Sequence, residues 1–188
     1  MAFRTYILNL RKFRKWHKFL GTSLALLLVI SALTGILLSL KKEVAIIQPP
    51  TTKGINTDLN NWLSIDEIDA IARRALYTAH PEQRQNPIDR LDIRPSKGIA
   101  KVLFDKGYWE VQIDGTTGEV KSIARRHSDW IEAVHDGSII SELFKLIAMN
   151  VLGIGLLMLI TTGLWLWYGP KKIRWLKKKY RGIIIKNK

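Results

Sequence analysis

The chain has 188 residues and a formal net charge of +14, from 30 Lys and Arg residues and 16 Asp and Glu residues. This length allows one small domain together with membrane segments. It contains no cysteine, which excludes disulfides, thiolate catalysis and iron–sulfur ligation by this chain.

The excess positive charge is confined to the two ends of the chain. Residues 1–18 carry six Lys and Arg residues, residues 171–188 carry nine, and neither segment has an acidic residue. Each basic end adjoins a long apolar run, as in membrane proteins that keep basic segments in the cytoplasm. Nucleic acid is not an expected partner, because no basic groove with interleaved stacking aromatics is recognisable.

Residues 1–18 predict a basic amphipathic helix that lies along the inner membrane surface. Residues 19–40 follow as 22 residues without a charge, which is long enough for a helix to cross the hydrocarbon core. A signal peptide is the alternative interpretation. The apolar run is long for a signal peptide and residues 41–45 offer no convincing cleavage site, so we predict an uncleaved anchor.

Residues 41–62 predict a linker, because Pro49, Pro50 and Gly54 stop a helix from continuing out of the membrane. A folded module is expected over residues 63–124. Its first element is an amphipathic helix over residues 64–78, which begins with a capping box formed by Ser64 and Glu67.

After His80 the apolar period changes from 3.6 to 2 residues, which indicates β-strands separated by turn sequences. The predicted strands are residues 88–94, 99–105, 108–114 and 119–123. We therefore expect one helix packed on an antiparallel sheet of three or four strands.

Residues 125–145 predict a connecting helix, and residues 146–169 a second membrane-spanning helix. Gly169 and Pro170 are expected to end that helix before a basic tail over residues 170–188. The predicted fold class is an α+β membrane protein, in which two spanning helices flank a small module. With both basic ends in the cytoplasm, residues 41–145 are expected to be extracytoplasmic.

The middle of the chain resembles a PepSY domain in two stretches. The first is the helix start Leu63-Ser64-Ile65-Asp66-Glu67. The second is residues 108–120, which has the pattern of a strand, an Asp-x-x-Thr-Gly turn and a second strand. The flanks resemble PepSY-associated transmembrane helices; the matching motifs are Trp16-His17-Lys18 with Gly21, Leu33-Thr34-Gly35, and Thr161-Thr162-Gly163-Leu164-Trp165. The resemblance implies a bacterial inner-membrane protein. Some members are linked to ferric-siderophore reduction through membrane haem, and PepSY domains elsewhere are thought to restrain peptidases or to act as interaction modules.

Histidine is the residue type on which a redox function would depend, because haem iron accepts axial imidazole. His17 marks the inner face and His135 the outer side, so these two are the candidate haem ligands. Gly21 would leave a gap for the macrocycle, and Thr162 and Gly163 should come near the level of His17. Each side has one histidine per chain, so a bis-imidazole site would need a second copy or a partner.

Two considerations oppose the haem hypothesis. If the helix before the second span is straight, His135 lies about 20 Å outside the membrane boundary near Asn150. His17 could equally be an interfacial residue beside Trp16, and His135 a polar residue facing Asp136.

The other polar residues give no catalytic or metal constellation. His80 is expected in a solvated turn, and His127 and His135 match no standard metal site. The acidic residues Asp66, Glu67 and Asp69 suit the first turn of a helix, and Asp114 suits its turn. No nucleophile with a plausible base is visible.

The leading hypothesis is a two-span membrane protein whose extracytoplasmic module binds a partner as an accessory subunit without catalysis, possible roles including an iron-uptake system. The alternatives are a haem-binding oxidoreductase subunit for ferric-siderophore reduction and a peptidase-restraining module. The expected partners are the lipid bilayer and either a second copy of the chain or another membrane protein.

Overall fold

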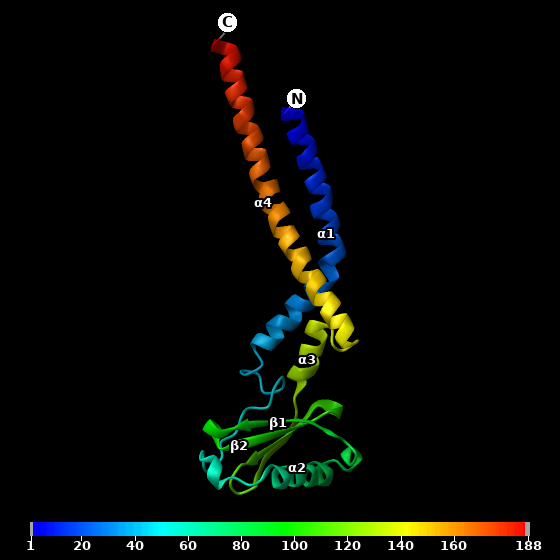
Figure 1. Cartoon of the computed structure of the whole chain (residues 1–188), viewed down its shortest axis with the longest axis vertical. Coiled ribbons are helices and arrows are strands. Elements are labelled where there is room, and N and C mark those ends of the chain that lie inside the picture. Colours follow the sequence, from blue (N-terminus) through cyan, green and yellow to red (C-terminus); the bar gives the residue numbers. More distant parts are fainter. Residues whose placement is uncertain (1, 187–188) are drawn as a thin grey trace. The chain divides into compact units, whose positions relative to one another are not determined.

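The structure, a computed structural model, describes the backbone of residues 2–186 and the side chains of residues 8–175, 177 and 178. The chain forms two compact units (Figure 1). The helical unit comprises Met1–Leu33 and Asp136–Lys188, and the sheet unit comprises Thr34–His135.

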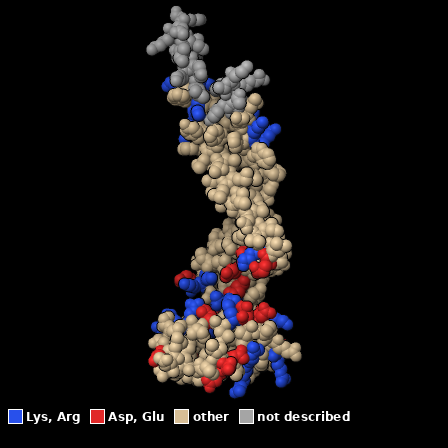
Figure 2. All heavy atoms as spheres, viewed as in Figure 1, with Lys and Arg blue, Asp and Glu red and all other residues tan. Residues whose placement is uncertain are grey.

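The helical unit contains most of α1 (Ala2–Ser39) and all of α4 (Glu142–Lys186). Both are long and apolar enough to cross a membrane, over Leu8–Ser39 and Glu142–Trp175. Their apolar side chains are largely exposed, including Leu26 at 71% and Leu143 at 67%. Figure 2 shows a long central stretch of this unit without charged side chains on the visible face. A surface of this kind is suited to lipid contact, since a soluble protein rarely exposes so large an apolar area.

Leucine side chains of α1 pack against glycines of α4, which brings the two helices close together. Leu24 and Leu10 are both 6% exposed. A Cβ atom added at Gly155 would overlap the side chain of Leu24, and one at Gly169 would overlap that of Leu10. Small residues are the usual means by which spanning helices approach closely.

Both helices extend beyond the boundaries expected from the sequence. No break at Lys18 separates the basic lead from the first span, since α1 is continuous. The prediction that Gly169 and Pro170 end the second helix is wrong, because α4 continues through Pro170 to Lys186. Gly169 serves a packing role against Leu10. Proline is tolerated in spanning helices where neighbouring groups satisfy the freed carbonyl.

The sheet unit is built on a four-stranded antiparallel sheet in the order β1-β2-β3-β4. Its strands are β1 (Ile88–Arg94), β2 (Ile99–Phe104), β3 (Trp109–Asp114) and β4 (Val120–Arg125). Neighbouring strands are joined directly in sequence, and the register places Lys101 opposite Gln112 and Leu103 opposite Glu110. The predicted strands and the α+β fold class are confirmed.

Helix α2 (Ile65–Ala79) covers one face of this sheet (Figure 1). The predicted capping box is present, with the Ser64 hydroxyl accepting from the Glu67 N–H and the Glu67 carboxylate accepting from Ser64. The core between helix and sheet is formed by buried apolar side chains of both: Ile68, Ala72, Leu76, Ala100, Val102, Phe104, Trp109, Val111 and Ile113. Alternation along β2 and β3 sends every other residue to the opposite face.

Short 3₁₀ turns complete the connections of the sheet unit. They are η1 (Leu59–Asn61), η2 (Pro81–Gln83), η3 (Pro95–Lys97) and η4 (Lys106–Tyr108). After β4 the chain enters α3 (His127–Asp136). The sequence predicted one connecting helix over residues 125–145, but α3 stops at Asp136 because Gly137 adopts a φ of +83° and ends the helix.

Candidate functional site

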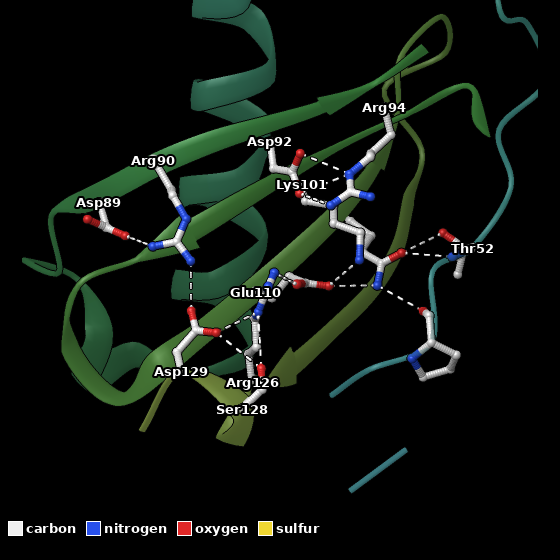
Figure 3. A network of polar contacts seen from close by, with 12 residues as sticks. Thr52, Asp89, Arg90, Asp92, Arg94, Lys101, Glu110, Arg126, Ser128 and Asp129 are labelled. Atoms are coloured by element: carbon white, nitrogen blue, oxygen red, sulfur yellow. Dashed lines mark hydrogen bonds and ion pairs between the residues drawn. The ribbon is translucent and has the colours of Figure 1, made fainter. Parts of the chain in front are cut away.

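The face of the sheet opposite α2 carries polar side chains that are almost completely buried (Figure 3). Lys101 is 1% exposed, and Glu110 and Gln112 are 0% exposed. These residues are brought together because they occupy alternate positions on the two central, paired strands. A buried charge is tolerated only when it is paired and hydrogen-bonded, so their partners decide whether this face is stable.

Glu110 is the centre of this buried network. Its Oε1 atom accepts from Lys101 Nζ at 3.1 Å and from Gln112 Nε2 at 2.8 Å. Its Oε2 atom accepts from Arg126 Nη1 at 3.1 Å. Arg126 also donates from Nε to Asp129 Oδ1 of α3 at 2.7 Å. The other carboxylate oxygen of Asp129, Oδ2, accepts from Arg90 Nη2 at 2.8 Å. The network therefore joins β1, β2, β3 and the start of α3.

The same polar face holds the segment that leaves α1. We call residues 49–56 the strap. Gln112 donates from Nε2 to the carbonyl oxygen of Pro50 at 3.0 Å, and its Oε1 accepts from both the N–H and the hydroxyl of Thr52 at 2.9 Å. The Gly54 N–H donates to Lys97 O at 2.8 Å. The backbone entering the module is thus fixed by side chains of β3.

Ile47, two residues before the strap, meets the start of α3 directly, because the Ser128 N–H donates to the carbonyl oxygen of Ile47 at 2.7 Å. Both segments that connect the module to the long helices therefore contact one buried polar layer. The strap is hydrogen-bonded to Gln112, and α3 is joined to Glu110 by Arg126. In chemical terms this layer is a structural network, since every one of its charged groups has a partner within the module.

Asp114 has the turn role expected from the sequence and a second role on the strap. Its Oδ1 accepts from the N–H groups of Thr116 and Thr117, at 2.9 and 3.0 Å, and its Oδ2 accepts from the Ile55 N–H at 2.7 Å. Burial by itself would raise the pKa of this carboxyl, but the backbone N–H donors outweigh burial and hold the pKa below its usual range.

The two candidate haem ligands lie in two clusters of similar composition, one in each unit. In the His17 cluster, His17 Nδ1 lies 2.8 Å from Thr162 Oγ1, and a Cβ at Gly163 would stand 3.4 Å from the His17 ring. In the His135 cluster, His135 Nδ1 lies 2.9 Å from Thr34 Oγ1, and a Cβ at Gly35 would stand 3.4 Å from the ring. Each histidine therefore contacts a Thr-Gly pair on a long apolar helix.

The hydrogen bonds of Thr162 define which nitrogen of His17 carries the proton. The Thr162 hydroxyl, which has a single proton, lies 2.6 Å from the Met158 carbonyl oxygen and donates to it. It must then accept from the Nδ1–H of His17. In a neutral imidazole this leaves the lone pair on Nε2, one of the two ring nitrogens through which histidine ligates metals.

The structure alters two of the geometric expectations for these histidines. His135 was expected outside the membrane, but it contacts Thr34, which lies within the predicted first span, because Gly137 ends α3 and the chain does not continue as a straight helix. Gly21 was expected to leave a gap for a macrocycle, but a Cβ added there would stand 3.7 Å from the Leu159 side chain, in ordinary van der Waals contact. The expected proximity of Thr162 and Gly163 to His17 is confirmed.

The remaining histidines and acids have structural surroundings. His80 lies in the turn between α2 and η2, as expected, but it is only partly solvated, since its side chain is 35% exposed and its ring lies 4.1 Å from that of Trp109. Its backbone N–H donates to Leu76 O at the end of α2. His127 begins α3 and is exposed. Asp69 pairs with Arg73. Among the described side chains, those of residues 8–175, 177 and 178, no three His, Cys, Asp or Glu groups come together as a metal site.

Taken together, two long apolar helices and a small α+β module define a membrane protein with one folded domain between its spans. A family model described as the PepSY-associated TM region matches residues 14–183. Since this match covers most of the chain, the chain belongs to that family, as its motifs predicted. A search of curated proteins gave no significant match.

Proposed function

We propose that the chain is a haem-carrying electron-transfer subunit of the bacterial inner membrane that serves ferric-siderophore reduction. The observation that supports this most directly is the pair of histidine clusters, in which a Thr-Gly pair on each long helix contacts an imidazole. The link to siderophores comes from the resemblance described above. Against the earlier objection that His135 would stand far outside the membrane, the proposal is supported by the contact of His135 with Thr34, which lies within the predicted first span.

The donor set of the His17 cluster fits haem ligation. Its Nδ1–H is hydrogen-bonded to Thr162, which orients the ring and leaves Nε2 as the basic nitrogen, as in metal-bound histidines with a hydroxyl or carbonyl partner behind them. Gly163 permits the helix of Thr162 to approach the ring closely. Bound haem would supply one-electron chemistry through its iron. His17 and His135 would hold it, and the Thr partners would position the rings.

Each cluster provides one histidine per chain, so a further protein ligand to the iron would come from a second copy of the chain or from a membrane partner. Close packing of α1 on α4 leaves the outward faces of both helices available for such an association.

The absorption spectrum of the full chain, purified in detergent from haem-replete cells, tests this proposal. We expect a Soret band that His17→Ala or His135→Ala reduces or removes. Thr162→Val should lower haem affinity about tenfold while keeping the ligand, because it removes only the group that orients the ring. The matched controls are His80→Ala and His127→Ala, which should leave the band unchanged.

A colourless preparation that also fails to bind added haem would overturn the haem proposal. It would favour the second candidate, an accessory subunit whose module binds a protein partner without catalysis. The observation behind that candidate is the rigid attachment of both connecting segments to the module through Gln112 and Arg126, which would let partner binding act on the membrane helices.

We further propose that both chain ends are cytoplasmic and that residues 41–145 are extracytoplasmic. The support is the concentration of Lys and Arg in the terminal segments. Because the natural chain has no cysteine, single-cysteine variants report cleanly. In intact cells a membrane-impermeant thiol reagent should label Thr117→Cys and should not label Lys171→Cys until the membrane is permeabilised. The reverse pattern would refute this topology.

A further inference from the structure

A pocket lies where α2 ends and η2 begins, away from both the buried polar layer and the histidine clusters. It has a volume of about 500 Å³ and is lined by Arg74, Tyr77, Thr78, Pro81 and Arg84. It is a hollow open to solvent, in which Arg74, Thr78, Pro81 and Arg84 are exposed and Tyr77 is half-buried. We call it the Arg74–Arg84 pocket.

The arginines of this pocket differ from the other arginines of the module. Seven arginines occur between residues 73 and 126. Five of them have an acidic or aromatic partner: Arg73, Arg90, Arg94, Arg125 and Arg126. Among the residues that the structure describes, Arg74 and Arg84 alone of the seven form no ion pair or cation–π contact, and both line the same pocket.

The other groups around the pocket are suited to a negatively charged ligand. The Tyr77 hydroxyl accepts from Arg73 Nη1 at 3.3 Å, so its own proton can be donated. Glu82, the nearby acid in η2, pairs with His80 Nδ1 at 3.5 Å and does not line the pocket. The Tyr77 ring and Pro81 supply apolar walls. Guanidinium groups bind carboxylates and phosphates through paired N–H donors.

The charge of the surrounding unit argues against a polyanion such as nucleic acid. Residues 34–135 contain 14 Lys and Arg residues and 14 Asp and Glu residues, so the unit has no net positive field. Attraction for an anion is therefore local to the two unpaired arginines. A small ligand matches this distribution better than a long chain of negative charges.

We propose that the Arg74–Arg84 pocket binds a small ligand with two oxyanion groups, carboxylate or phosphate, one for each guanidinium. The Tyr77 hydroxyl donates a further hydrogen bond, and the ligand backbone packs on Pro81. This assigns the module a ligand-recognition role that is independent of haem.

The test uses the full chain in detergent micelles at low ionic strength, titrated by calorimetry with citrate as the carboxylate probe and pyrophosphate as the phosphate probe. We expect at least one probe to bind at one site per chain, and the probe preferred identifies the oxyanion. Arg74→Gln and Arg84→Gln should each weaken binding about tenfold, as expected for loss of a charge-assisted hydrogen bond. The double variant should show no binding.

The matched control is Arg94→Gln, which removes an exposed arginine already paired with Asp92 and should leave the affinity unchanged. Lack of binding of either probe, or binding that persists in the double variant, would overturn the proposal. Protection of Arg74 and Arg84 from phenylglyoxal by the bound probe, read by mass spectrometry, gives an independent readout. Neither measurement depends on haem, so a colourless protein that binds citrate would separate this proposal from the redox one.

Discussion

Replacing Glu110 with alanine is expected to destabilise the sheet unit by about 3–5 kcal/mol, which is the usual cost of breaking a buried ion pair from one side. The change leaves the Lys101 ammonium, only 1% exposed, without its carboxylate partner. It also removes the acceptor of Gln112 and of Arg126. Thermal unfolding of the full chain in detergent, followed by far-ultraviolet circular dichroism and by hydrogen exchange of the strand amides, measures the loss.

The control for this change is Asp92→Ala, which breaks the exposed ion pair with Arg94. Pairs of that kind contribute at most about 1 kcal/mol. Lys101→Met in the Glu110→Ala background should recover part of the stability, because it removes the uncompensated charge. If Glu110→Ala and Asp92→Ala cost the same, the polar layer is not the buried network described above.

Gly54→Ala is the second substitution with a large expected effect, because the strap lies directly on the backbone of the β1–β2 connection. A Cβ at residue 54 would overlap the carbonyl oxygen of Gly98 and stand 2.6 Å from its carbonyl carbon. These are backbone atoms that cannot rotate away. Relieving the overlap requires the strap to move, which would break the hydrogen bonds from Gly54 to Lys97 and from Ile55 to Asp114.

We expect a loss of about 3 kcal/mol, at the upper end of the range for overpacked sites. Faster hydrogen exchange at the amides of Thr52, Gly54 and Ile55 should accompany it, which localises the effect to the strap. Thr51→Ala, at an exposed neighbouring position, is the matched control and should change neither quantity. Unchanged exchange in Gly54→Ala would mean that the strap is not held on the sheet.

Much of the module could be predicted from the sequence because its signals are local. Ser64 and Glu67 define the start of α2 three residues apart, and the change to a period of 2 after His80 defines the strands. The Asp114 turn was predictable because Asp followed by Gly and Thr forms such turns without help from distant residues. Gly137 was the exception, since a single glycine ended α3 inside a segment that otherwise had a helical pattern.

The buried polar layer was missed because its partners are far apart in the sequence. Lys101 interrupts an otherwise apolar strand, and Glu110 and Gln112 alternate with core residues, so the period of 2 indicates that these two share a face. What the sequence does not contain is the cover over that face. Pro50 and Thr52 lie about 60 positions from Gln112, and a linker rich in proline gives no sign that it folds back onto a sheet.

The two histidine clusters illustrate the same limit. The lengths of the two apolar runs predict that His17 lies near the level of Thr162 and Gly163, since two helices that span one bilayer must cover the same thickness. The position of His135 could not be obtained in that way, because it depends on where α3 stops.

The length of α4 exceeds what a membrane crossing requires. A 45-residue helix measures about 68 Å, more than twice the hydrocarbon thickness of a bilayer. Since Pro170 does not interrupt it, the helix continues beyond its apolar stretch into a segment rich in lysine and arginine. A helical backbone gives such a basic segment a regular rise of about 1.5 Å per residue, which a flexible peptide of the same composition would not have.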